Sequence, residues 1–153
     1  MPYEHYLRNT VLRYLDLMGK DYAYDPDRGT IEVREDVGPI VIHFSEYWLH
    51  ICYTGIPIPE DIKEQDIFRI LVELNRSINE VKLYVENGLI LVRTDANILG
   101  LSFDNFYIKY SIVAIVAGSL RRIISEAARG IRINKHEFLS TVKEMVRRFL
   151  RRA

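Results

Sequence analysis

Cysteine is almost absent from the sequence: among 153 residues, only Cys52 carries a thiol. A single cysteine excludes an intramolecular disulfide and a cysteine-rich zinc site, and it favours a reducing compartment. Cys52 lies in the apolar run 49–53, where no neighbouring motif would activate a thiolate. We therefore expect a buried side chain at this position and not a nucleophile.

Long hydrophobic runs are absent as well. The longest apolar stretch, residues 111–120, is about half of the roughly 20 residues that a membrane-spanning helix needs. The first residues lack the basic-then-apolar order of a signal peptide. We expect a cytoplasmic protein that does not engage a membrane. Gln65 is the only glutamine, and with the many isoleucine, arginine and glutamate residues this composition leans toward a heat-adapted source.

Motifs of known active sites are also missing. The sequence contains no G-x-S-x-G, P-loop, G-x-G-x-x-G or H-E-x-x-H pattern. We therefore predict a protein that is not an enzyme and that holds no cofactor and no metal. A weaker alternative is an enzyme of unknown class that acts on a small molecule, which would require a deep polar pocket.

Two groups of residues could in principle hold a metal ion. His43 and His50 lie in neighbouring predicted strands and could come close, but no cysteine or third histidine supports a site. The acidic residues of the first strands do not follow the spacing of a calcium loop, so a solvated acidic edge is the expected reading. These residues are Asp25, Asp27, Glu32, Glu35 and Asp36.

Basic and acidic residues balance at 21 each, yet they are divided along the chain. Residues 1–119 carry 11 Lys and Arg against 18 Asp and Glu, whereas residues 120–153 carry 10 against 3. The basic end either lies on the acidic part of its own or another subunit, or is offered to an anionic partner. Arginines in a last helical turn also stabilise the helix dipole. The possible interaction surface comprises Arg121, Arg122, Arg147, Arg148, Arg151 and Arg152.

Apolar periodicity defines the first half of the chain. Residues 4–18 have helical spacing, and Gly19 follows where a C-terminal cap would lie. Residues 25–29 form a turn sequence, after which strands are expected over 30–34, 40–44 and 47–54. Their short connections favour an antiparallel meander.

The second half contains helices and one hairpin. A helix from residue 60 or 65 to 78 precedes two strands, 81–86 and 89–94, whose Asn-Gly junction is a strong hairpin signal. A long helix is expected from residue 104 or 105 to about 128, and its apolar middle, 112–117, should be covered on every side. Asn134 as N-cap, with Glu137 three residues later, begins a basic amphipathic helix that ends at 152.

Together these elements predict the α+β class. We expect an antiparallel sheet, made of a three-strand meander plus a hairpin, flanked by helices in the order α-β-β-β-α-β-β-α with an added C-terminal α-helix. The predicted organisation is a single domain over 1–153, with an α+β core over 4–128 and the added helix over 134–152.

This order of elements resembles the type III secretion chaperone-like fold, especially the YbjN-like proteins. The phrase that carries the resemblance consists of Leu71, Leu74 and Asn75, followed by the hairpin 81–92. The resemblance implies a non-enzymatic, often dimeric protein that binds other polypeptides in a chaperone or regulatory role. It also implies a structural Asn75 that ends the helix and bonds the backbone. The added basic helix departs from the family and could cover the surface that the family uses.

The leading hypothesis is therefore a chaperone-like or regulatory homodimer that binds a protein or peptide through an exposed helix or sheet face. Trp48 and the ten tyrosines could contribute to such a surface, although most are expected at the core or its edge. The alternative is a nucleic-acid-associated regulator that uses the basic C-terminal helices. That alternative has less support, because the tail offers only Phe138 and Phe149 as stacking aromatics, and both lie on its apolar stripe.

Overall fold

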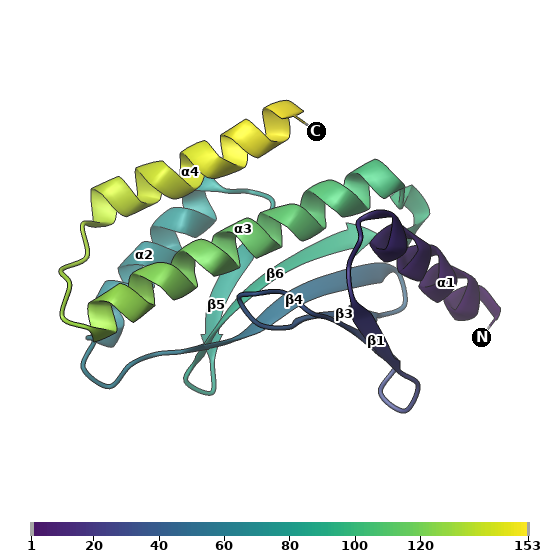
Figure 1. The fold of residues 1–153 in the computed structure, drawn as a ribbon, viewed down its shortest axis with the longest axis horizontal. Coiled ribbons are helices and arrows are strands. Elements are labelled where there is room, and N and C mark those ends of the chain that lie inside the picture. The colour runs from purple at the N-terminus through teal and green to yellow at the C-terminus, as the bar shows by residue number, and fades with distance from the viewer. Residues whose placement is uncertain (1, 153) are drawn as a thin grey trace.

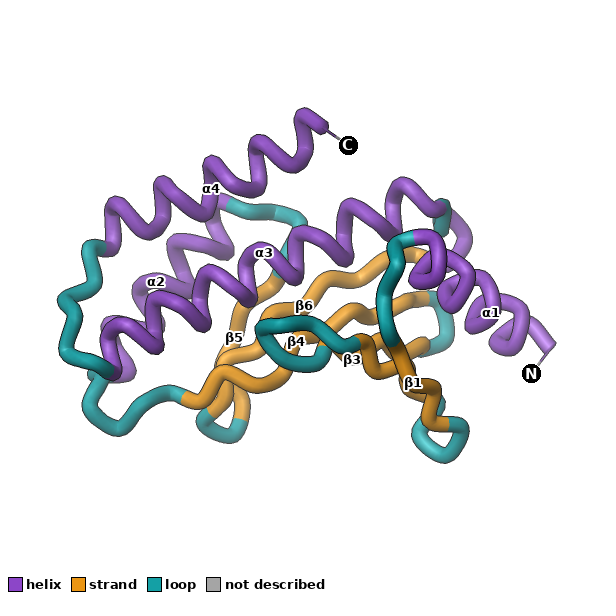
Figure 2. Tube along the Cα trace, viewed as in Figure 1, coloured by secondary structure: helices purple, strands orange, loops and turns teal. Residues whose placement is uncertain are grey.

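The computed structural model describes residues 2–152, so the first and last residues of the predicted domain lie outside the described residues. An antiparallel sheet with strand order β1-β2-β3-β4-β6-β5 is flanked by four helices, which confirms the predicted α+β class (Figures 1 and 2). In chain order the elements are α1 (Pro2–Leu17), β1 (Tyr22–Asp25), β2 (Thr30–Val33), β3 (Ile40–Phe44), β4 (Trp48–Pro57), α2 (Glu64–Ser77), β5 (Lys82–Glu86), β6 (Leu89–Asn97), the short 3-10 helix η1 (Ile98–Gly100), α3 (Phe103–Ala128) and α4 (Lys135–Arg152).

The meander has one strand more than predicted. β1 pairs with β2 from Tyr22 opposite Val33 to Asp25 opposite Thr30, so four strands and not three precede α2. The turn between them lies where the sequence predicted it, and Gly29 adopts a φ of 66°. β1 was missed because its residues, unlike those of the equally short β2, do not alternate between buried and exposed, although Tyr22 and Tyr24 pack against the core on one side.

The β5–β6 hairpin is confirmed at the predicted junction. Asn87 and Gly88 have φ values of 53° and 75°, the left-handed conformation that a two-residue turn of this kind requires. β6 continues three residues past its predicted end, because β4 pairs with it as far as Trp48 opposite Asn97.

The helices lie on one side of the sheet. Alternate residues of β4, Leu49, Ile51 and Tyr53, are buried toward them. The apolar middle of α3 is covered as predicted, and its Ile112 and Val116 are fully buried. α4 runs antiparallel to α3 as an outer layer over α2 and α3 (Figure 1). Its buried residues, Phe138, Val142 and Val146, recur at every fourth position.

The opposite side of the sheet carries the intervening residues and forms its open face. We use that name for the side chains on this side of β3, β4, β5 and β6, which are mostly polar or partly exposed. An antiparallel sheet often keeps one face toward solvent in this way. Among residues 2–152, none of the helices has the length and hydrophobicity needed to cross a bilayer.

Candidate functional site

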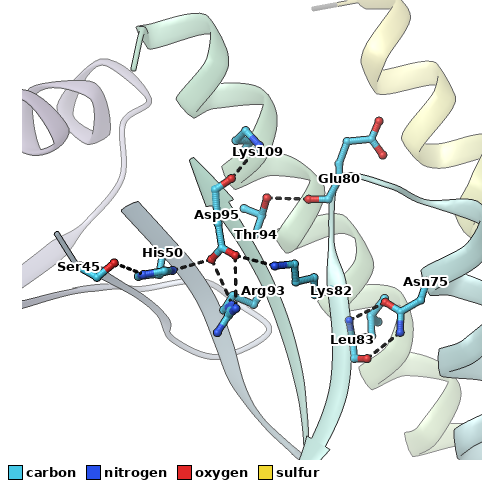
Figure 3. A network of polar contacts seen from close by, with 10 residues as sticks. All are labelled: Ser45, His50, Asn75, Glu80, Lys82, Leu83, Arg93, Thr94, Asp95 and Lys109. Atoms are coloured by element: carbon cyan, nitrogen blue, oxygen red, sulfur yellow. Dashed lines mark hydrogen bonds and ion pairs between the residues drawn. The ribbon is translucent and has the colours of Figure 1, made fainter. Parts of the chain in front are cut away.

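Asp95 of β6 is the centre of a polar cluster on the open face (Figure 3). Its carboxylate lies 2.6 Å from Nδ1 of His50, 3.1 Å from Nζ of Lys82 and 3.2 Å from Nε of Arg93. Strand pairing explains the gathering, because β4 places His50 opposite Asp95 and β5 places Lys82 opposite Arg93. We call these four residues together with Ser45 the Asp95 cluster.

Asp95 is held as a carboxylate. Its side chain is only 15% exposed, and this burial opposes ionisation. Hydrogen bonds from His50 and Lys82 and the nearby charge of Arg93 outweigh the burial, so that the pKa of Asp95 lies below its ordinary value. Because Lys82 and Arg93 both surround this one carboxylate, this part of the open face has more hydrogen-bond donors than acceptors.

His43 and His50 come close, which the strand assignment allowed but did not fix. They face each other across β3 and β4, with ring centroids 4.7 Å apart and planes inclined by 31°. Burial, followed by the nearby charges of His50 and Arg93, lowers the pKa of His43. Over the part of the chain that the structure describes, no group of three or more His, Cys, Asp and Glu residues could hold a metal ion.

Ser45 extends the Asp95 cluster toward the end of the sheet. Its Oγ lies 2.7 Å from Nε2 of His50, on the side of the ring opposite Asp95 (Figure 3). The backbone of Ser45 and Trp48 closes the tight turn between β3 and β4, and the N–H of Ser45 donates to the carbonyl of Trp48 at 2.9 Å. Tyr47 and Trp48 of this turn are 58% and 44% exposed.

A shallow hollow of about 370 Å³ adjoins the cluster. It forms because β5 begins at Lys82, so that residues 94–97 of β6 have no strand beside them on that edge. Two contacts occupy the gap: Nζ of Lys109 donates to the carbonyl of Asp95 at 2.9 Å, and Oγ1 of Thr94 donates to the carbonyl of Glu80 at 2.6 Å. The lining residues are Trp48, His50, Asn79, Glu80, Lys82, Thr94, Asp95 and Lys109.

The six arginines of the predicted interaction surface are divided between two places. Arg121 donates to the Tyr53 hydroxyl at 2.8 Å and therefore supports the fold near β4. Arg122 is exposed on α3 beside Arg121. The other four arginines, Arg147, Arg148, Arg151 and Arg152, form a C-terminal set that is exposed on α4, and within it Arg147 and Arg148 pair with Glu144. This end of α4 contacts α3 through Phe149 and Tyr107, and Arg121 lies about four turns further along α3, roughly 21 Å from Tyr107.

The acidic residues of the first strands serve local structure. Glu35 accepts a hydrogen bond from the Tyr110 hydroxyl at 2.6 Å and lies 2.8 Å from Nζ of Lys20. The Asp25 carboxylate accepts the backbone N–H of Asp27 within the first turn. These contacts do not converge on a common point. Cys52 is buried as predicted, and burial raises the pKa of its thiol to about 11, which disfavours the reactive thiolate at neutral pH.

Asn75 is a structural residue. Its side-chain amide donates to the carbonyl of Leu83 and accepts the N–H of Leu83, both at 2.8 Å (Figure 3). In this way α2 satisfies the outer edge of β5, a strand that pairs on its other side with β6. The helix itself ends two residues later, at Ser77.

Sequence reasoning identified His43, His50 and Trp48 but missed the rest of this site. Ser45 lies between the predicted strands 40–44 and 47–54, and Asp95 lies one residue beyond the predicted end of the hairpin. The pairing of β4 with β6 brings Asp95 to His50, and those strands are separated in sequence by α2 and β5. The signal available in the sequence was that His50 and Asp95 both occupy outward positions of long strands, where pairing could bring them together.

Three solved structures share this fold. A chain of the HopA1–SchA chaperone-effector complex matches with a TM-score of 0.61 at 15% sequence identity, covering 76% of this chain and 94% of that chain. YbjN from E. coli, a proposed transcription regulator, matches with a TM-score of 0.60 at 12% identity, covering 78% and 92%. An uncharacterized protein from Methanothermobacter thermautotrophicus matches with a TM-score of 0.61 at 17% identity, covering 79% and 98%.

These matches confirm the resemblance to the YbjN-like, secretion-chaperone-like fold that the order of elements indicated. Each match covers nearly the whole of the other chain and leaves roughly a quarter of this one outside it. No protein-family model and no curated protein matches the sequence.

Proposed function

We propose that this chain is a chaperone-like or regulatory domain that binds polypeptide segments, that it acts as a homodimer, and that it works in the cytoplasm. The observation that carries the proposal is a helix-backed sheet whose other face is open, in a fold shared with a chain of a chaperone-effector complex. The exposed Tyr47 and Trp48 beside the Asp95 cluster mark the part of that face best suited to contact a partner.

This region combines the groups that protein interfaces favour. Aromatic side chains supply a large apolar area with little conformational freedom to lose, and charged groups around them fix the orientation of a partner. Within the cluster, Lys82 is exposed, while Arg93 lies over the ring of Tyr84, 5.8 Å from its centroid. A segment laid across β4, β6 and β5 would meet Trp48 first and then the donors of Lys82 and Arg93.

Affinity capture with matched variants tests the proposal. The immobilised protein is incubated with lysate of its source organism, with and without nuclease treatment, and bound proteins are identified by mass spectrometry. We expect a set of polypeptides that survives nuclease treatment and is depleted by Trp48→Ala. Phe68→Ala on α2 is the control, because Phe68 is 45% exposed and Trp48 44%. Equal depletion by both variants, or capture that depends on nucleic acid, would contradict binding through the open face.

The homodimer has its own test. Light scattering and sedimentation over a range of concentrations should give twice the mass of one 18.0 kDa chain. A single-chain mass at every concentration would refute the dimer while leaving polypeptide binding to the capture experiment.

A second candidate function is favoured by the arginines of α4. Arg147, Arg148, Arg151 and Arg152 are exposed, and the ion pairs that they form among the described residues stay within α4, with Glu144. Such a set suits an anionic partner, including nucleic acid. If the helix binds DNA or RNA, binding must fall steeply as salt increases, and Arg151→Ala together with Arg152→Ala must reduce the salt dependence. Failure to retain DNA or RNA at low salt would eliminate this function.

A further inference from the structure

Ser45, His50 and Asp95 form a continuous chain of hydrogen-bonding groups (Figure 3). Oγ of Ser45 is 2.7 Å from Nε2 of His50, and Nδ1 of the same ring is 2.6 Å from the carboxylate of Asp95. Hydroxyl, imidazole and carboxylate in this order, with the two ring nitrogens facing opposite partners, are the arrangement that activates a serine in hydrolases. Such an arrangement is recognised by geometry and not by a sequence motif.

The carboxylate is suited to orient the ring. Lys82 contacts the Asp95 oxygen that His50 does not, and Arg93 contacts both oxygens, so that the carboxylate remains charged and fixed. It is therefore placed to hold the Nδ1 proton and to stabilise an imidazolium formed when Nε2 accepts the serine proton. The ring of His43 packs against the ring of His50, with 4.7 Å between the two centroids, and restricts the rotation of the His50 ring.

Donors for an oxyanion lie directly after Ser45. The tight turn uses the N–H groups of Ser45 and Trp48, while the N–H groups of Glu46 and Tyr47 have no acceptor among the described residues. The backbone N–H of the residue after a nucleophile is a common oxyanion donor in hydrolases. The chain thus offers free amides next to the hydroxyl that would attack.

The surroundings restrict the class of substrate. Tyr47 and Trp48 are exposed on the turn that follows Ser45, whereas the hollow on the Asp95 side of His50 is lined partly by Trp48 but not by Ser45. An aromatic or short apolar group can contact these rings, whereas a long acyl chain finds no deep apolar cavity here.

We propose that Ser45 is a nucleophile that attacks small activated esters carrying an aromatic or short acyl group. Oγ bonds to the carbonyl carbon while its proton passes to Nε2 of His50. The carbon–oxygen bond to the leaving group then breaks, and the leaving oxygen takes that proton. Water, deprotonated in turn by His50, then bonds to the acyl carbon, the Oγ–carbon bond breaks, and Oγ takes the proton back from His50 as the acid is released. This activity goes beyond polypeptide binding and has a separate readout.

Covalent labelling tests the proposal. The full-length protein is treated with a fluorophosphonate probe, which forms an Oγ–phosphorus bond with loss of fluoride, and the modified residue is mapped by mass spectrometry. We expect an adduct on Ser45, its absence in Ser45→Ala, and its retention in Ser140→Ala, which removes an exposed serine of α4. In His50→Gln the labelling rate should fall about 100-fold, the usual contribution of a general base.

A second variant decides the matter if His50→Gln is poorly folded. Ser45→Cys places a thiol beside the imidazole, and its alkylation by iodoacetamide should be fast at about pH 7, whereas wild-type protein, whose only thiol is the buried Cys52, should react slowly. No adduct on Ser45 in the folded protein, labelling unaffected by His50→Gln, or an introduced thiol that reacts only at alkaline pH would each overturn the proposal. None of these results would decide whether the protein binds polypeptides, which the capture experiment tests separately.

Discussion

The residues of the candidate site contact side chains that are distant in sequence. Asp95 contacts His50, 45 positions earlier, and Lys82, 13 positions earlier, because three strands converge there. Neither contact is visible in a window of sequence. The burial of Cys52 could be predicted because it depends on a local apolar run, whereas the structural role of Asn75 was implied only by the resemblance to the YbjN-like fold.

Asp95→Asn should change how stability depends on pH. Because the pKa of Asp95 is lower in the folded than in the unfolded protein, the unfolded chain takes up a proton first as the pH falls below about 4. The stabilisation by Asp95 is therefore complete at neutral pH and is lost progressively as the pH approaches and passes below that value. We expect the variant to be less stable than wild type at neutral pH, with a difference that shrinks between about pH 5 and pH 2.

Thermal unfolding of both proteins across this range measures that difference. Asp61→Asn, which removes an exposed carboxyl group, is the control and should follow the wild-type curve closely. A constant difference between Asp95→Asn and wild type at all pH values would show that Asp95 is not preferentially ionised in the folded protein.

Asn75→Ala should destabilise the protein by about 1–3 kcal/mol, because it leaves the N–H and carbonyl of Leu83 without partners at a partly buried strand edge. Chemical denaturation measures the effect. Ser77→Ala, an exposed change near the end of the same helix, should stay within about 0.5 kcal/mol of wild type. Equal effects of the two changes would mean that the amide does not support β5.

At the level of elements, the longer patterns were predictable and one short strand was not. The helix over 103–128 and the hairpin 82–97 follow from periodicity and an Asn-Gly pair. β1 escaped because its four residues become a strand only by pairing with β2. The additional length of β6 has the same cause, since its last residues pair with β4 alone.

Two substitutions in α4 test whether this last helix is held by apolar packing. Val142 of α4 is fully buried, so Val142→Ala should lower the free energy of unfolding by about 2 kcal/mol. Arg148→Ala removes an exposed charge whose ion-pair partner within residues 2–152 is Glu144, and it should change stability by less than about 0.5 kcal/mol. Denaturant titration of the two variants compares them directly. A larger effect from Arg148 would show that charge, and not packing, attaches α4.

At the scale of the whole molecule, few ion pairs in the described part of the chain join the acidic part, residues 1–119, to the basic part, residues 120–153. The sequence predicted that the basic end could lie on the acidic body, and α4 does pack on α2 and α3. Its contact with them is mainly apolar, and Lys135 with Asp66 is the ion pair that joins α4 to α2 among the described residues. The arginines at the end of α4 therefore remain directed to solvent, while the open face lies on the other side of the sheet.

The site itself could be predicted from sequence only in part, for a reason that belongs to this scale. Adjacent predicted strands carry His43 and His50, with Trp48 near the start of the second, and the β3–β4 register then places the two histidines opposite each other. The Asp95 cluster requires the order in which β6 inserts between β4 and β5, which local pattern does not specify. For the same reason the division of the arginines into two places required the positions of α3 and α4.

Hydrogen–deuterium exchange, recorded with and without a captured polypeptide, tests the central claim most directly. If the open face is the binding surface, protection on binding should concentrate in the turn 45–48 and in β4 and β6, while α4 exchanges as in the free protein. Protection confined to α4 and the end of α3, with the open face unchanged, would contradict this account and assign the interaction to the arginines.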